Sequence, residues 1–165
     1  MFWSEEIIEH IVTQSNKYAQ QKNVTLNLTK EELYVLLWAM LLSGYSKFPN
    51  KRMYWSSYDV PKMLYNSIRL NRFETILRHL HFNDNILNDK TDKLYKLRPI
   101  IIHLNERFRE HGGLEEHISI DESMIPYYGK HYAKQYIKSK PIRFGYKNWA
   151  LCSNTKYYVT FEIYW

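Results

Sequence analysis

The sequence predicts an α+β fold in which a helical N-terminal region is followed by strands. Apolar residues recur at helical spacing as far as about residue 111, and from His117 they alternate with polar residues, as in a strand. The glycines Gly112 and Gly113 separate the two patterns. The chain has 165 residues, of which 45% are hydrophobic and 16% aromatic, and this composition excludes a disordered tail.

The first two helices have the clearest signals. Residues 5 to 20 carry an apolar stripe at helical spacing. The second helix begins at a capping box, with Thr29 as the N-cap and Glu32 returning a hydrogen bond to its amide. The run from Leu33 to Leu42 is apolar on all sides, which favours a buried helix that ends at Gly44.

The next part of the helical region is less regular. We expect a loop anchored by Tyr54 and Trp55, a short helix at residues 61 to 67 and a longer one at 71 to 82. A further helical pattern runs from residue 93 to 111. Pro99 interrupts it, and because proline lacks an amide donor we expect a break there.

Three segments have the pattern of strands, at residues 117 to 126, 142 to 152 and 157 to 164. In the first of them, Asp121 lies on the face opposite Ile118 and Ile120, whereas Glu122 shares their face. A carboxylate at the end of a strand is held rigidly yet reaches solvent, so Asp121 is the candidate ligand for a divalent metal. A capping or turn role is the alternative for this residue.

The positive charge is concentrated in one segment. The net charge is +6, but residues 123 to 161 contain no Asp or Glu and carry seven basic residues, so the rest of the chain has a net charge of −1. Basic residues interleaved with tyrosine favour a nucleic-acid surface. A solvated basic face without a partner is the alternative. The candidate DNA-binding residues are Lys130, Lys134, Lys138, Lys140, Arg143 and Lys147.

Several protein classes are excluded. The longest apolar run, Leu33 to Leu42, is half of the ~20 residues that a membrane span needs. The first residues lack the basic and apolar regions of a signal peptide. The single cysteine, Cys152, excludes an intramolecular disulfide and a cysteine-rich zinc module. We therefore expect an intracellular protein with no membrane partner.

Several motifs, in the same order along the chain, resemble the piggyBac-type DDE transposases. The central one is the strand with the sequence ISIDESMIP at residues 118 to 126. A weaker likeness, at residues 14 to 19, has Ser15 where the family has threonine. The other similar segments are residues 52 to 56, 71 to 74, 80 to 85, 92 to 96, 98 to 99, and 135 to 136 through 140 to 147.

The resemblance implies a helical pre-catalytic region at residues 1 to 112 and the start of an RNase H-like catalytic domain at 113 to 165. In the family, three aspartates hold two Mg²⁺ ions for DNA cleavage and strand transfer, and Asp121 matches the first. The resemblance also implies DNA as the partner, a possible homodimer and a nuclear location. After Asp121 the acidic residues are Glu122 and Glu162 alone, so we expect an incomplete domain and no strong Mg²⁺ binding by this chain.

Two hypotheses about function follow. The chain is a transposase fragment that is inactive alone, or it is a non-enzymatic DNA-binding or interaction module derived from a transposase. The reading frame beyond Trp165 would separate them, because further spaced aspartates favour the first. With the RNase H-like sheet incomplete, we expect the strand at 117 to 125 to have an open edge. We also expect exposed apolar side chains at Ile118, Ile120, Val159, Phe161 and Ile163.

Overall fold

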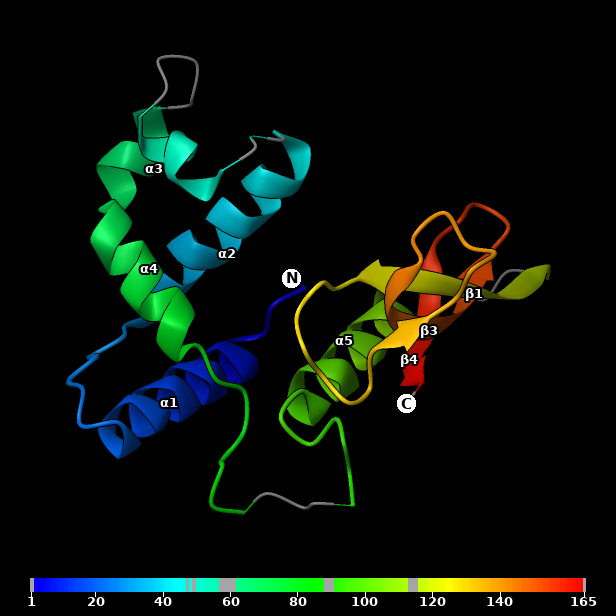
Figure 1. The fold of residues 1–165 in the computed structure, drawn as a ribbon, viewed down its shortest axis with the longest axis horizontal. Coiled ribbons are helices and arrows are strands. Elements are labelled where there is room, and N and C mark those ends of the chain that lie inside the picture. The colour runs from blue at the N-terminus through cyan, green and yellow to red at the C-terminus, as the bar shows by residue number, and fades with distance from the viewer. Residues whose placement is uncertain are drawn as a thin grey trace. The chain divides into compact units, whose positions relative to one another are not determined.

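The computed structural model describes residues 2–46, 48, 50–56, 62–87, 91–112 and 116–164. It divides into two compact units, the first formed by Trp3–Asn88 and the second by Asp89–Trp165 together with Phe2. In the described residues, the first unit contains only helices and the second combines one α-helix with an antiparallel sheet (Figure 1). None of the described helices has the length and apolar character needed to cross a membrane.

The first unit is held together by apolar side chains from three of its helices. Ile8 and Ile11 of α1, Leu33 and Leu36 of α2, and Ile76 of α4 are completely inaccessible to solvent. The helices predicted at residues 5 to 20 and 61 to 67 are confirmed. The expected loop contains a 3-10 helix that carries Tyr54 and Trp55, and the helix expected at residues 71 to 82 ends earlier, at His79. The elements of this unit are α1 (Glu5–Gln21), α2 (Lys30–Tyr45), the 3-10 helix η1 (Lys51–Trp55), α3 (Lys62–Ser67) and α4 (Leu70–His79).

Helix α2 confirms one prediction and corrects another. The capping box between Thr29 and Glu32 is present in both directions. The expected end at Gly44 is wrong, because the helix continues to Tyr45. The expected burial on all sides is also wrong in the second half of the helix, where Leu41 is 70% exposed and Tyr45 is 91% exposed.

An ion pair joins α2 to α4. The Arg72 guanidinium donates from Nε to Glu32 Oε1 over 2.7 Å and from Nη2 to Glu32 Oε2 over 2.5 Å, and Nη1 donates to the Leu26 carbonyl over 2.8 Å. These hydrogen bonds lower the pKa of the Glu32 carboxyl below its ordinary value. Glu32 therefore caps its own helix and anchors the neighbouring one.

The sheet of the second unit is organised around a single strand. Strand β3 (Phe144–Ser153) pairs antiparallel with β1 (Ile118–Pro126), with the two-residue strand β2 (Gln135–Tyr136) and with β4 (Tyr158–Tyr164). The three predicted strands are confirmed within two residues at their ends. The strand β2 was not predicted, because its two residues lie inside a segment without alternation.

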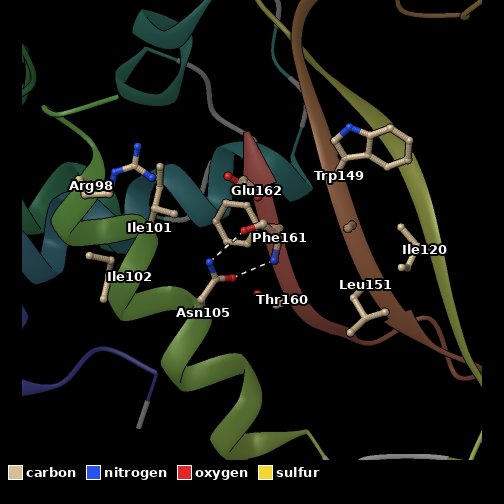
Figure 2. A pocket seen from close by; sticks show the side chains of 11 residues that line it. Arg98, Ile101, Ile102, Asn105, Ile120, Trp149, Leu151, Thr160, Phe161 and Glu162 are labelled. Atoms are coloured by element: carbon tan, nitrogen blue, oxygen red, sulfur yellow. Dashed lines mark hydrogen bonds between the residues drawn. The ribbon is translucent and has the colours of Figure 1, made fainter. Parts of the chain in front are cut away.

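Helix α5 (Arg98–His111) covers the outer edge of β4 (Figure 2). The Asn105 side chain donates to the Phe161 carbonyl over 2.9 Å and accepts from the Phe161 amide over 2.8 Å, so it pairs with β4 as a neighbouring strand would. Pro99 lies in the first turn of α5, which confirms the predicted break.

The packing of α5 overturns an expectation about exposure. Val159 and Ile163 are buried and Phe161 is partly buried, because α5 covers their strand, so their predicted exposure is wrong. The compact units divide between residues 88 and 89, whereas we expected a division at residue 112. The difference arises because α5 packs against the sheet. The family-level domain boundary stays a prediction.

Strand β1 is an edge strand in the described part of the sheet. Ile118 is 52% exposed and Ile120 is 70% exposed, which confirms the expectation for these two residues. No described strand pairs with the second edge of β1, as we expected from the sequence.

We expect Arg72→Met to destabilise the contact between α2 and α4. The loss should be about 1–2 kcal/mol, since charged hydrogen bonds are removed from partly exposed side chains. The lowered pKa of Glu32 means that this stabilisation is complete above the ordinary pKa of glutamate and is lost as the pH falls through the folded-state value. Hydrogen exchange of the α4 amides across this pH range measures both effects.

The matched control for this experiment is Arg69→Gln. Arg69 is exposed and makes no ion pair among the residues that the structure describes. If Arg69→Gln and Arg72→Met accelerate exchange equally, the Arg72–Glu32 pair does not hold the two helices together.

We expect Asn105→Ala to expose the edge of β4. The substitution leaves the amide and carbonyl of Phe161 without their partner, at a cost of about 1–3 kcal/mol. Hydrogen exchange at the Phe161 amide should accelerate more than at the amides of β3. Glu106→Ala, one residue further along α5 and exposed, is the control. An unchanged exchange rate at Phe161 would contradict this role of Asn105.

Candidate functional site

Asp121 lies in the middle of β1 with an exposed side chain. It is paired across the sheet with Ala150. Its Oδ1 accepts a hydrogen bond of 2.7 Å from the amide of Glu122. Ser123 and Asn148 lie on the same face, where the Asn148 side chain donates to Ser123 Oγ over 3.3 Å. The register thus confirms that Asp121 and Glu122 lie on opposite faces.

Glu122 is bound to two of the basic residues. Its Oε1 lies 3.2 Å from Lys140 Nζ, and its Oε2 lies 2.5 Å from Lys147 Nζ. Lys147 and Lys140 hold the pKa of the Glu122 carboxyl below its ordinary value, Lys147 having the larger effect. The Lys147 ammonium also lies 4.7 Å from the centre of the Trp149 ring, where it is attracted by the ring electrons.

These carboxylates do not form a site for two metal ions. Among the described residues, no group of three His, Cys, Asp or Glu side chains is close enough to hold a metal ion. The nearest candidate in sequence, Glu122, faces away from Asp121 and is occupied by lysines. The residues described here therefore do not fit a pair of Mg²⁺ ions, which needs several converging carboxylates.

The six candidate DNA-binding residues fall into two groups. Lys140 and Lys147 are paired with Glu122, which neutralises part of their charge. The remaining four have no ion pair within the described ranges, and the side chains of all but Lys134 are exposed. These unpaired cations are Lys130, Lys134, Lys138 and Arg143.

Two aromatic side chains lie beside the unpaired cations. Tyr136 of β2 and Phe144 of β3 are direct cross-strand partners, with their ring centres 4.7 Å apart. They are 54% and 45% exposed. The Lys134 ammonium lies 5.7 Å from the centre of the Phe144 ring. We call Tyr136 and Phe144 the aromatic pair.

The aromatic pair was not predicted as a unit. The pattern in residues 123 to 161 indicated basic residues interleaved with tyrosine, but the pairing of Tyr136 with Phe144 depends on β2, which is only two residues long. The sequence does contain a signal for the pair, because both rings have basic neighbours within two positions. Lys134 and Lys138 flank Tyr136, and Arg143 directly precedes Phe144.

A pocket of about 420 Å³ lies between α5 and the sheet (Figure 2). It is lined by apolar residues of both, including Ile101, Ile102, Ile120 and Trp149. By strand parity most of the sheet residues that line it share the face of Glu122, and Asp121 is not among the lining residues. The pocket is therefore separate from the candidate metal ligand.

The fold is shared with a known transposase. Over 99% of this chain and 37% of the other, it matches the structure described as "Cryo-EM structure of piggyBac transposase synaptic complex with hairpin DNA", with a TM-score of 0.85 and 21% sequence identity. The match confirms the predicted α+β fold, with helices followed by strands of an RNase H-like sheet.

Sequence comparisons identify relatives of the same kind. A family described as Transposase IS4 matches residues 1–165. PiggyBac transposable element-derived protein 2 of Homo sapiens is 43% identical over 164 residues, and protein 3 is 45% identical over 166 residues. The matches cover 98% and 99% of this chain and 28% of each relative, so the chain spans just over a quarter of their length. The chain belongs to the piggyBac-type DDE transposase family.

Proposed function

We propose that this chain supplies the first catalytic aspartate and a DNA-contacting surface of a piggyBac-type transposase, and that it does not cut or join DNA alone. The observation that carries the proposal is the position of Asp121. It is exposed on a strand of an RNase H-like sheet. The sequence of this strand resembles the family motif that bears the first catalytic aspartate.

Catalytic inactivity of the chain by itself follows from the metal requirement. Two Mg²⁺ ions would activate the attacking oxygen and stabilise the leaving oxygen of the DNA backbone, and they need several carboxylates to hold them. Glu122 and Glu162, the other carboxylates on the described strands, lie on the face of the sheet opposite Asp121, and no described group of three possible ligands is close enough to hold a metal ion. Asp121 alone would hold Mg²⁺ weakly, with water as the remaining ligands.

The unpaired cations favour a second function, DNA binding without catalysis. Lysine and arginine side chains that neutralise phosphates release bound counterions, and this release drives binding to DNA of any sequence. The neighbouring structure is of a transposase with hairpin DNA, which supports DNA as the partner of this chain. A homodimer and a nuclear location are further proposals, and they rest on the family resemblance alone.

We expect no Mg²⁺- or Mn²⁺-dependent hairpin formation or strand joining by the isolated chain on transposon-end DNA. Denaturing gels of end-labelled DNA measure both reactions. A known active transposase of the family is the positive control. Activity of this chain that Asp121→Ala abolishes would show that the catalytic centre is complete without further carboxylates.

We expect the four unpaired cations to account for most of the duplex DNA binding. Their replacement by Gln should lower the affinity and reduce the slope of log affinity against log salt by up to about 3 to 4, or about 0.9 per lost phosphate contact. Fluorescence anisotropy with a labelled 20-base-pair duplex at several salt concentrations measures the slope. The residues replaced are Lys130, Lys134, Lys138 and Arg143.

The control variant replaces Glu122, Lys140 and Lys147 by Gln together. It removes one carboxylate and the two ammonium groups paired with it, a net loss of a single positive charge. The slope of log affinity against log salt should therefore change by less than about 0.9, the value for one phosphate contact. If the control and the fourfold variant lower the slope equally, the ion pairs with Glu122 do not protect these lysines from DNA. If neither variant changes the slope, the basic segment is a solvated face.

A further inference from the structure

The aromatic pair differs from the other exposed aromatic side chains of the sheet in its surroundings. Its two rings contact each other, expose about half of their area to water and lie among cations that have no ion pair in the described chain. Exposed aromatic rings next to unpaired cations are typical of proteins that bind single-stranded nucleic acids.

The pair is held rigidly by the backbone. Tyr136 and Phe144 are opposite each other on the β2–β3 ladder, and the amide of Ile137 donates to the Arg143 carbonyl over 2.9 Å just beyond it. The Phe144 carbonyl accepts from the Tyr127 amide over 3.3 Å, which links the same position to the end of β1. The backbone that carries both rings is therefore ordered before a base binds, which reduces the entropy lost on binding.

The charges around the pair suit a nucleic-acid backbone. Lys134 lies over the Phe144 ring, Arg143 precedes Phe144 in the chain, and Lys138 follows Tyr136 by two residues. Lys138 and Arg143 are exposed and have no ion pair in the described segments. Phosphates on either side of a stacked base would therefore be attracted to positive side chains.

We infer that the aromatic pair is a stacking platform for unpaired bases of single-stranded DNA. The inference rests on the proposed DNA-binding function and adds the kind of DNA that this part of the surface binds. Bases inside a duplex are covered on both faces by their neighbours, so only an unpaired or extruded base offers a free face to the rings. The cations alone would bind duplex and single strands with no such preference.

The test compares single-stranded with duplex DNA. Wild-type chain and a Tyr136→Ala/Phe144→Leu variant are titrated into labelled dT20 and into a labelled 20-base-pair duplex at one salt concentration. Loss of a stacked base should weaken dT20 binding by about fivefold or more. Duplex binding should change by less than about twofold, because the four cations remain. Tyr136→Phe, which keeps the ring, should bind dT20 as the wild type does.

Two further measurements guard against indirect effects. Tyr45→Ala removes an exposed tyrosine from the first unit and should leave both affinities unchanged. Ultraviolet cross-linking of the wild-type chain to dT20 that contains one 5-iodouracil needs no variant, and mass spectrometry should locate the cross-link at Tyr136 or Phe144. A cross-link elsewhere would overturn the inference.

The outcomes separate this inference from the proposed function. If the double variant weakens dT20 binding and duplex binding equally, the aromatic pair is not a stacking platform. The same conclusion follows if it weakens neither. Salt-dependent duplex binding through the four cations would then still support the proposed function. If the wild-type chain binds neither DNA, the inference and the proposed DNA-binding function both fail.

Discussion

The close approach of three strands at Gly145 is the constraint on which the second unit depends. Gly145 is opposite Pro126 of β1 and opposite Gln135 of β2. A Cβ atom at this position would lie 2.0 Å from the Ile125 carbonyl oxygen, so no side chain fits unless the backbone of β1 moves. Because β1 carries Asp121 and β2 carries Tyr136, the strands that bear both candidate features meet at this glycine.

The pleat of β1 then separates the roles of two neighbouring carboxylates. Asp121 and Glu122 differ by one position, which places them on opposite faces of the sheet. Glu122 meets Lys140 and Lys147 and becomes part of an ion-paired cluster, while Asp121 remains exposed without such partners in the described chain. A register shift of one residue would exchange these environments. The observed register therefore determines which of the two carboxylates is exposed without an ion pair in the described chain.

Local patterns predicted the elements better than their partners. The capping box at Thr29 and the alternation in β1 and β4 concern residues close together in sequence, and the structure confirms them. The packing of α5 against β4 depends on Asn105 reaching Phe161, 56 residues away, and no local pattern reports such a contact. The pairing of lysines with Glu122 was missed for the same reason. This pairing leaves four of the six predicted DNA-binding residues without an ion pair in the described chain.

The motifs that carried the family resemblance serve different purposes. Arg72 joins two helices through Glu32. Arg98, the first residue of α5, binds both oxygens of Asp92 at 2.6 and 2.8 Å. Such residues maintain the fold, so their presence does not by itself indicate catalysis. Asp121 is exposed and takes no part in an ion pair that the structure describes. Its position therefore cannot be attributed to stabilising contacts of the kind that Arg72 and Arg98 make, and for this reason the proposed metal-binding role rests on Asp121 and not on the motif residues that hold the fold.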